Sequence, residues 1–187
     1  MLRTASSGVV PRPYLRDDES QLIERAARGD STALAALYRL HGSAVLTLAF
    51  RLIGERADAE DVLHDVFVGL PEALRRYEHR GSFGPWLRRV TVRIALMRLR
   101  AARRRREVDI DPELGADGIT QAMDDKRAIE MALARLSPAL RSVVVLKVIE
   151  GYSHREIAQL LHISPAASEA RLSRAMAALR VHLRGQL

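Results

Sequence analysis

The chain has 187 residues, which is room for one ordinary domain or two small ones. Hydrophobic residues make up 48% of it but aromatic residues only 4%, and this composition favours helices over strands. The formal net charge of +7 favours an anionic partner, and the absence of cysteine excludes disulfides, thiolate catalysis and cysteine-ligated zinc.

Residues 1–16 are expected to form a disordered tail. They contain three Gly or Pro residues and show no helical period. They also lack the apolar run of a signal peptide. The longest apolar stretch, Val143–Ile149, is short and interrupted by Lys147, so we expect a cytoplasmic protein without membrane insertion.

Residues 17–106 predict a first domain of four helices. The first helix is expected to end at Gly29, and Asp30 is expected to cap the second. An apolar stripe then follows a helical period as far as Gly54. Asp58 is predicted to cap the third helix. The fold class expected from this half is all-α.

The third helix carries a set of acids on one face. They are Asp58, Glu60, Asp61 and Asp65. Acids near a helix N-terminus often serve only as partners of the helix dipole. An acidic patch on a basic protein is alternatively a docking surface for a basic protein partner. The residues alone leave both interpretations open.

The fourth helix, which Gly84 and Pro85 open, lies in the most basic part of the chain. Residues 75–106 hold twelve Arg and one acid, a balance of +11. An apolar arc is predicted to face the core: Trp86, Leu87, Val90, Ile94, Met97 and Ala101. The adjoining arc is basic: Arg89, Arg93, Arg100, Arg103 and Arg104. This pattern suits a helix lying along a phosphate backbone, with a solvated helix face as the alternative.

Three aromatic residues stand near the start of this helix. They are Tyr77, Phe83 and Trp86, in a chain that has few other aromatics. Aromatic rings beside a basic groove can stack on unpaired bases, but a small domain also needs large rings in its core. Core packing and base stacking therefore both remain open for each ring.

Residues 107–122 are expected to form a flexible acidic linker. The stretch 107–125 holds seven acids and no base, and it includes Pro112, Gly115 and Gly118. The linker separates the first domain from a second one at residues 123–187.

The second domain predicts a helix-turn-helix. Ser153 and Glu156 have the spacing of a capping box, and Ser164 with Pro165 begins another helix only eleven positions later. A short helix over 154–161, a tight turn and a longer helix from Pro165 match the unit that places its second helix in a major groove. A plain helical hairpin is the alternative.

Three segments together resemble a bacterial RNA polymerase sigma factor of the extracytoplasmic-function (ECF, group 4) class. They are DAEDVLHDVF (58–67), GSFGPWLRRVTVRIALMRLR (81–100), and the stretch 136–180 that contains the helix-turn-helix. The resemblance implies two helical domains that bind core RNA polymerase and direct transcription initiation, in a stress or envelope response. It also implies an anti-sigma factor as a partner.

The resemblance assigns expected roles to individual residues. Core polymerase binding falls to Asp58, Glu60, Asp61 and Asp65. Melting and binding of the single-stranded minus-ten element fall to Tyr77, Phe83, Trp86, Arg89, Arg93 and Arg100. Contact with the double-stranded minus-thirty-five element falls to Arg155, Ala170, Arg171, Ser173 and Arg174.

The chain departs from the family pattern at four positions. Arg93 and Met97 stand where the promoter-facing helix usually has Asn and Asp, and Glu169 replaces a usual Lys. His162 stands at the usual turn glycine, and His adopts left-handed conformations more readily than most residues. Because Arg offers only donors, we expect Arg93 to bind phosphate rather than select a base. The promoter sequence therefore does not follow from the resemblance.

Two other classes of protein are alternatives to a sigma factor. A DNA-binding regulator with the same helix-turn-helix would need a sensing or phosphoacceptor domain, and residues 17–106 show no strand pattern for one. An enzyme is not expected, because the six His are scattered without ligand spacing and no phosphate loop or nucleophile motif occurs. We therefore expect neither a cofactor nor a metal.

Overall fold

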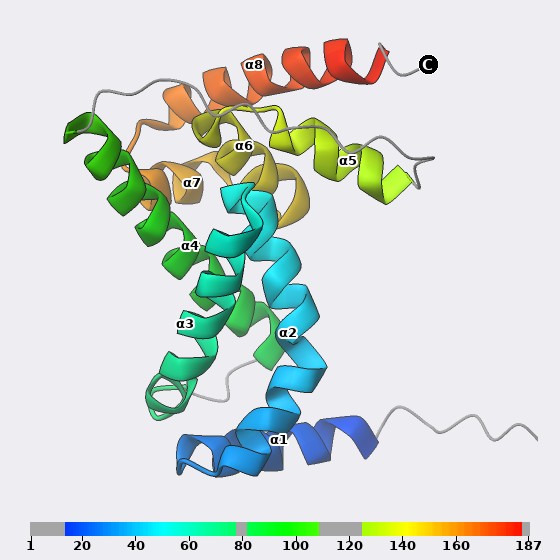
Figure 1. Cartoon of the computed structure of the whole chain (residues 1–187), viewed down its shortest axis with the longest axis vertical. Helices are drawn as coiled ribbons and strands as arrows, with labels where there is room; N and C mark the ends of the chain where they lie inside the picture. Colours follow the sequence, from blue (N-terminus) through cyan, green and yellow to red (C-terminus); the bar gives the residue numbers. More distant parts are fainter. Residues whose placement is uncertain (1–13, 78–81, 109–124, 185–187) are drawn as a thin grey trace, which may run out of the picture. The chain divides into compact units, whose positions relative to one another are not determined.

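A computed structural model describes residues 14–77, 82–108 and 125–184, and every element within these ranges is a helix (Figure 1). The elements are α1 (Tyr14–Ala27), α2 (Ser31–Ile53), α3 (Arg56–Leu74), α4 (Phe83–Val108), α5 (Asp125–Ala134), α6 (Pro138–Val144), η1 (Val145–Ile149), α7 (His154–Leu161) and α8 (Pro165–Arg184). The all-α prediction is confirmed for these residues. Most of the expected tail and linker lies outside them, although α1 begins within the predicted tail, at Tyr14.

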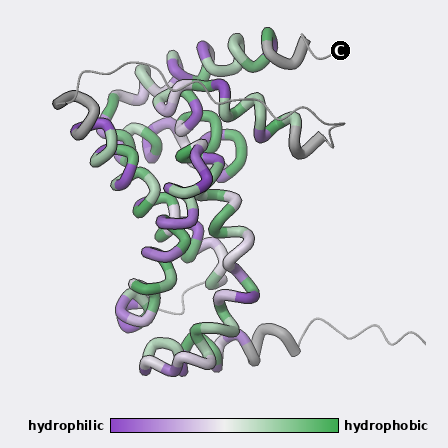
Figure 2. The backbone as a smooth tube through the Cα atoms, viewed as in Figure 1, coloured by the Kyte–Doolittle hydropathy of each residue, from purple (hydrophilic) through white to green (hydrophobic). Residues whose placement is uncertain are grey.

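The chain divides into two compact units, and each is described by itself. One contains residues 1–42 and 67–78, and the other contains residues 43–66 and 79–187. In Figure 2 hydrophobic and hydrophilic residues alternate along α3, α4 and α8, as expected for helices with one buried and one exposed face.

The first unit is built around the turn between α1 and α2. Gly29 has a φ of 88°, which ends α1 in the left-handed conformation that glycine adopts without strain. Asp30 then caps α2: its Oδ1 accepts the backbone N–H groups of Thr32 and Ala33 at 2.9 and 3.1 Å. The Ala33 hydrogen bond is the main cause that lowers the pKa of Asp30. Both predicted helix boundaries are confirmed.

Buried apolar residues from three helices form the core of this unit. They are Ile23, Ala26, Ala33, Leu37, Phe67, Leu70 and Leu74. Tyr38 meets Phe67 edge to face, with ring centroids 4.9 Å apart. His41 Nε2 lies 2.7 Å from Glu19 Oε1, so a polar contact also ties α2 to α1.

Helix α2 is more apolar over its full length than the expectation based on the stretch Val143–Ile149 allowed for. Its 23 residues are long and apolar enough, by length and composition alone, to cross a membrane. Such a test is weak, since core helices of ordinary domains also pass it. Here α2 buries Leu37, Val45, Leu48 and Leu52, which is the stripe expected of a core helix.

The cap of α3 differs from the prediction. The helix begins at Arg56, and the Glu55 carboxylate accepts the Asp58 N–H at 2.9 Å. Backbone hydrogen bonds from Asp58 and Ala57 lower the pKa of Glu55. Glu55 therefore caps the helix, and Asp58 lies within its first turn. The cap therefore lies three residues earlier than expected, and the Asp58 side chain does not cap the helix.

In the second unit a buried arginine closes the end of α2. Arg141 of α6 is only 5% exposed and donates to the backbone carbonyls of Leu52, Ile53 and Ala134. Its burial lowers its pKa. Gly54, with a φ of 84°, leaves the space that this guanidinium fills, because a Cβ there would overlap it.

The helices of residues 125–184 follow the predicted order. The helix that Ser137 and Pro138 begin does extend to about Glu150, but its second half is a π-helical turn. The Glu150 N–H donates to the Val145 carbonyl at 3.0 Å, five residues back. Gly151, with a φ of 76°, then ends the turn.

Candidate nucleic-acid interface

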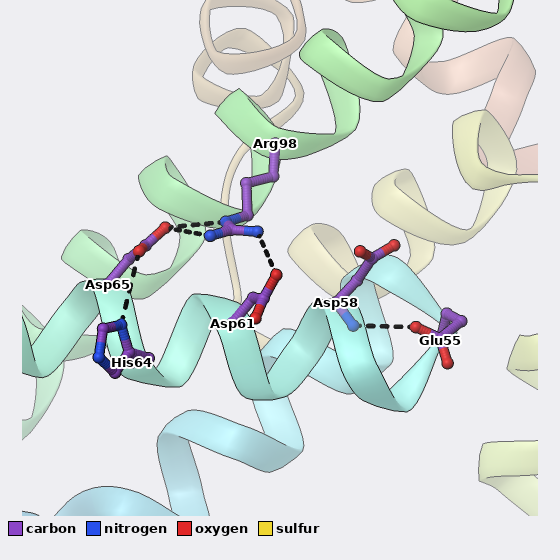
Figure 3. Close-up of polar contacts among 6 residues, drawn as sticks. All are labelled: Glu55, Asp58, Asp61, His64, Asp65 and Arg98. Atoms are coloured by element: carbon purple, nitrogen blue, oxygen red, sulfur yellow. Dashed lines mark hydrogen bonds and ion pairs between the residues drawn. The ribbon is translucent and has the colours of Figure 1, made fainter.

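The acids of α3 are not all available as the sequence implied, because Arg98 of α4 lies between two of them (Figure 3). Its Nε and Nη2 contact Asp65 Oδ2 at 2.8 and 2.7 Å, and its Nη1 donates to Asp61 Oδ2 at 2.8 Å. Burial opposes the charge of Arg98, but the bonds to Asp65 and Asp61 outweigh it and raise its pKa. One guanidinium therefore fixes two carboxylates and links α3 to α4.

The acidic face nevertheless remains open to a partner. The Asp61 side chain is 61% exposed, and Asp65 is half-buried. Asp58 is exposed and uses only its backbone N–H for the contact with Glu55 that Figure 3 draws. Glu60 is exposed and pairs with Arg56 one turn earlier at 2.8 Å. The four predicted acids thus lie on an accessible surface of α3 with local partners for three of them.

Helix α4 presents the predicted arginine arc to solvent. Arg89, Arg93, Arg100, Arg103 and Arg104 are all exposed. Arg98 lies on the opposite side of the helix from Arg89, since nine residues make about two and a half turns. The stripe is therefore a surface of guanidinium groups along one helix, an arrangement that suits contact with a phosphate backbone.

The apolar arc predicted for α4 is wrong in its orientation. Met97 is 54% exposed, and Trp86, Val90 and Ile94 are only half-buried. Of the predicted arc only Leu87 is buried, and it faces the core together with Phe83, Thr91, Val92, Ala95 and Leu96. The rest of the predicted arc is instead the border between the core and the arginine stripe, so partly exposed apolar side chains run beside the basic residues.

The three aromatic residues separate into different environments. Phe83 is 3% exposed and packs against Trp86, with ring centroids 5.6 Å apart. A ring so deeply buried cannot stack on a base in this conformation, which favours the core-packing alternative for Phe83. Trp86 and Tyr77 are half-buried and each presents part of its surface to solvent. In this conformation base stacking is therefore open to these two rings.

The helix-turn-helix is confirmed with both of its caps. Ser153 Oγ accepts the Glu156 N–H at 3.2 Å, and Glu156 accepts the Ser153 N–H at 2.7 Å, which completes the capping box. The Ser153 hydrogen bonds lower the pKa of Glu156. His162 has φ 53° and ψ 50°, the left-handed conformation expected at the turn. Ser164 Oγ then accepts the Ala167 N–H at 3.1 Å to begin α8.

The outer face of α8 carries the predicted DNA-contacting residues. Ala170, Ser173 and Arg174 are exposed, Arg171 is half-buried, and Arg155 is exposed on α7. Arg174 Nε lies 3.4 Å from the carbonyl of Ala170, which directs its side chain along the helix. The inner face of α8 packs on α7. Ala175 of α8 is fully buried there, and Ile157 and Ala158 of α7 are buried as well.

Sequence reasoning missed several residues that shape this interface. Arg98, Arg141 and the contact between His154 and Ser168 all join parts of the chain that are far apart in sequence or on different helices. Helical periodicity places Arg98 away from the arginine stripe, and this was the one signal that set it apart. No local pattern identified Arg141 or Ser168.

Comparison with known proteins identifies two matching families along the chain. Residues 37–105 match the family model for sigma-70 region 2, and residues 126–179 match the one for sigma-70 region 4. The RNA polymerase sigma factor NccH of Alcaligenes xylosoxydans xylosoxydans is 33% identical, over 86% of this chain and 92% of that protein. The RNA polymerase sigma factor CarQ of Myxococcus xanthus is 34% identical, over 88% and 97%.

A solved structure also resembles most of the chain. It is that of CnrH in complex with the cytosolic domain of CnrY. CnrH is 28% identical to this chain, the match covers 90% of this chain and 99% of that one, and the TM-score is 0.50.

Proposed function

The chain belongs to the extracytoplasmic-function class of RNA polymerase sigma factors, and on that premise we propose how its residues divide the work of transcription initiation. Sigma factors are initiation factors that bind core RNA polymerase and direct it to promoters. The observation that carries the proposal is the order of region 2 and region 4 in one chain. Region 2 here carries an acidic face and an arginine stripe, and region 4 carries a helix-turn-helix.

The two regions support a functional division of the chain. We assign residues 17–106 to core binding and the minus-ten element and residues 123–187 to the minus-thirty-five element, with the acidic stretch 107–122 as the connection. The family matches at 37–105 and 126–179 lie within these limits.

Each proposed role has a physical basis in the side chains. The exposed acids of α3 suit basic side chains of core polymerase. The arginine stripe, with Tyr77 and Trp86 near it in sequence, suits the single-stranded minus-ten element, which offers phosphates and unpaired bases. The outer face of α8 suits a major groove, where Arg171 and Arg174 can reach base edges and phosphates.

A protein partner and a location accompany this function. The structure of CnrH was solved with a second protein bound to it. We propose that this chain likewise has an inhibitory partner of the anti-sigma kind, and that it acts in the cytoplasm, where the polymerase works.

Transcription in vitro tests the function directly. Core polymerase alone starts transcription without promoter selection, so a sigma factor is recognised by the new start sites that it confers. We expect the purified chain to give defined transcripts from genomic fragments when it is added to core polymerase. A chain that binds DNA but confers no start site would instead be an ordinary helix-turn-helix regulator.

Arg93 provides a prediction about the minus-ten strand. Replacing Arg93 by Asn should weaken binding of the holoenzyme to single-stranded minus-ten DNA about threefold to tenfold, because one phosphate contact is lost. The preference among the four bases should stay unchanged, because Arg93 is exposed on the arginine stripe and we propose that its guanidinium contacts phosphate. Binding measured with strands carrying each base at each minus-ten position checks this. A switched base preference with unchanged affinity would show that position 93 reads a base.

A further inference from the structure

A hydrogen bond joins the two helices of the helix-turn-helix at a buried place. His154 Nδ1, on the first residue of α7, lies 2.9 Å from Ser168 Oγ, at the end of the first turn of α8. Ser168 is 0% exposed, and His154 is half-buried. A hydroxyl group at such a depth needs a partner, and which atom donates depends only on the imidazole tautomer.

The other contacts at this helix crossing do not fix its angle in the same way. Ile157, Ala158 and Ala175 are buried there, and apolar burial holds two helices together without a preferred direction. Helix α8 also packs on α5 and α6. The contact between His154 and Ser168 is directional, because hydrogen bonds weaken steeply outside a narrow range of distance and angle.

A change in the tilt of α8 at this hydrogen bond would displace the residues on the outer face of α8. Arg174 lies six residues beyond Ser168, which is about 9 Å along the helix axis. A tilt of about 10° around Ser168 would move the backbone at Arg174 by roughly 1.6 Å, which exceeds the half-ångström range of good hydrogen-bond distances. Contacts with base edges require such precision, whereas attraction to phosphates tolerates the shift.

We propose that His154 and Ser168 are positioning residues that set the angle of α8 and thereby the base selectivity of the helix-turn-helix. The pair acts through the outer face of α8 and touches no DNA itself. This inference rests on the proposed reading of the minus-thirty-five element by α8. Loss of the hydrogen bond between His154 and Ser168 should reduce base selectivity, while the general affinity for DNA remains.

The test uses holoenzyme reconstituted from the full chain and core polymerase. Duplexes randomised over the minus-thirty-five element are bound, recovered and sequenced, so no promoter has to be known beforehand. We expect Ser168→Ala to lower the enrichment of the preferred sequence by roughly tenfold, the scale of one well-made base contact. Binding to the unselected pool and its salt dependence should stay as in the wild type.

Variants of His154 separate positioning from simple loss of packing. His154→Leu should lower the enrichment as much as Ser168→Ala does, and the double variant no further, because both changes remove one bond. His154→Asn should restore selectivity, since its amide group offers a polar atom near the place of Nδ1. Should Ser168→Ala fail to fold, the two His154 variants, made at a half-buried position, still decide the question.

Ser142→Ala serves as the matched control. It also removes a buried hydroxyl group, but Ser142 Oγ donates at 2.7 Å to the Pro138 carbonyl within its own helix. The Ser142→Ala variant should enrich the preferred sequence as strongly as the wild type does. All proteins are compared well below their unfolding temperatures. Equal loss in Ser142→Ala, or unchanged enrichment in folded Ser168→Ala, would overturn the proposal. If the wild-type holoenzyme enriches no sequence, the minus-thirty-five role falls, and the positioning pair falls with it.

Discussion

Replacing Asp65 by Lys is expected to lower the affinity for core RNA polymerase by roughly 30-fold, or about 2 kcal/mol. The change replaces an attraction to basic groups of the partner by a repulsion, and each effect contributes about 1 kcal/mol at a partly exposed site. The loss should shrink at high salt, because exposed charges are screened. Competition binding with labelled core polymerase at low and high ionic strength measures both effects.

The bond between Asp65 and Arg98 makes a control necessary. Asp65→Lys also removes the two short contacts with Arg98 and places a like charge beside it, so the free energy of unfolding should fall by about 1–2 kcal/mol. Arg98→Met removes the same contacts but keeps both acids. We expect it to lose stability while its core affinity stays within about twofold of wild type. If Arg98→Met loses as much affinity as Asp65→Lys, the acids act only by joining α3 to α4.

Replacing Arg171 and Arg174 together by Ala is expected to lower affinity for the minus-thirty-five duplex by roughly 100-fold. One lost base contact accounts for about 1–3 kcal/mol, and one lost phosphate contact reduces the salt slope by about one. The single variants should divide these effects, so that one relaxes selectivity at a single base pair and the other lowers affinity for every sequence. Titration of holoenzyme with duplexes over a range of salt concentrations measures each part.

Arg180→Ala is the charge-matched control for this experiment. Arg180 lies on the same helix and is exposed, but it stands beyond the turns of α8 expected to enter the groove. Its removal should change duplex affinity less than threefold. Equal weakening by Arg180→Ala would mean that α8 contributes net charge rather than specific contacts.

Local signals in the sequence predicted the helices and the helix-turn-helix well. The capping box of Ser153 and Glu156 and the cap at Asp30 each depend on residues a few positions apart. The left-handed His162 was expected from the family resemblance, because it stands at the usual turn glycine. Such features are determined by short-range backbone hydrogen bonding, which one stretch of sequence specifies by itself.

Features that depend on packing between distant segments could not be predicted in the same way. Arg98 and Asp65 are 33 positions apart, and Arg141 and Leu52 are 89 positions apart. The orientation of α4 was also misjudged, because periodicity shows which residues share a face but not which face meets the core. Met97 consequently looked buried and is exposed. The sequence thus predicted which helix faces carry the candidate site, but not the contacts between helices that fix those faces in position.

The π-helical turn at Val145–Ile149 has a consequence for how this region tolerates changes in length. A π turn holds one residue more than an α turn, so it is equivalent to a single-residue insertion that the helix has absorbed. Deleting one residue here would let α6 continue as a regular helix to the same end point, with Ser153 still in place to cap α7. The same deletion within α7 would rotate the residues after it in α7 by about 100° relative to those before it. It would thereby displace α8 from its contact with His154. This turn is therefore a place where the chain can lose a residue without moving the helix-turn-helix.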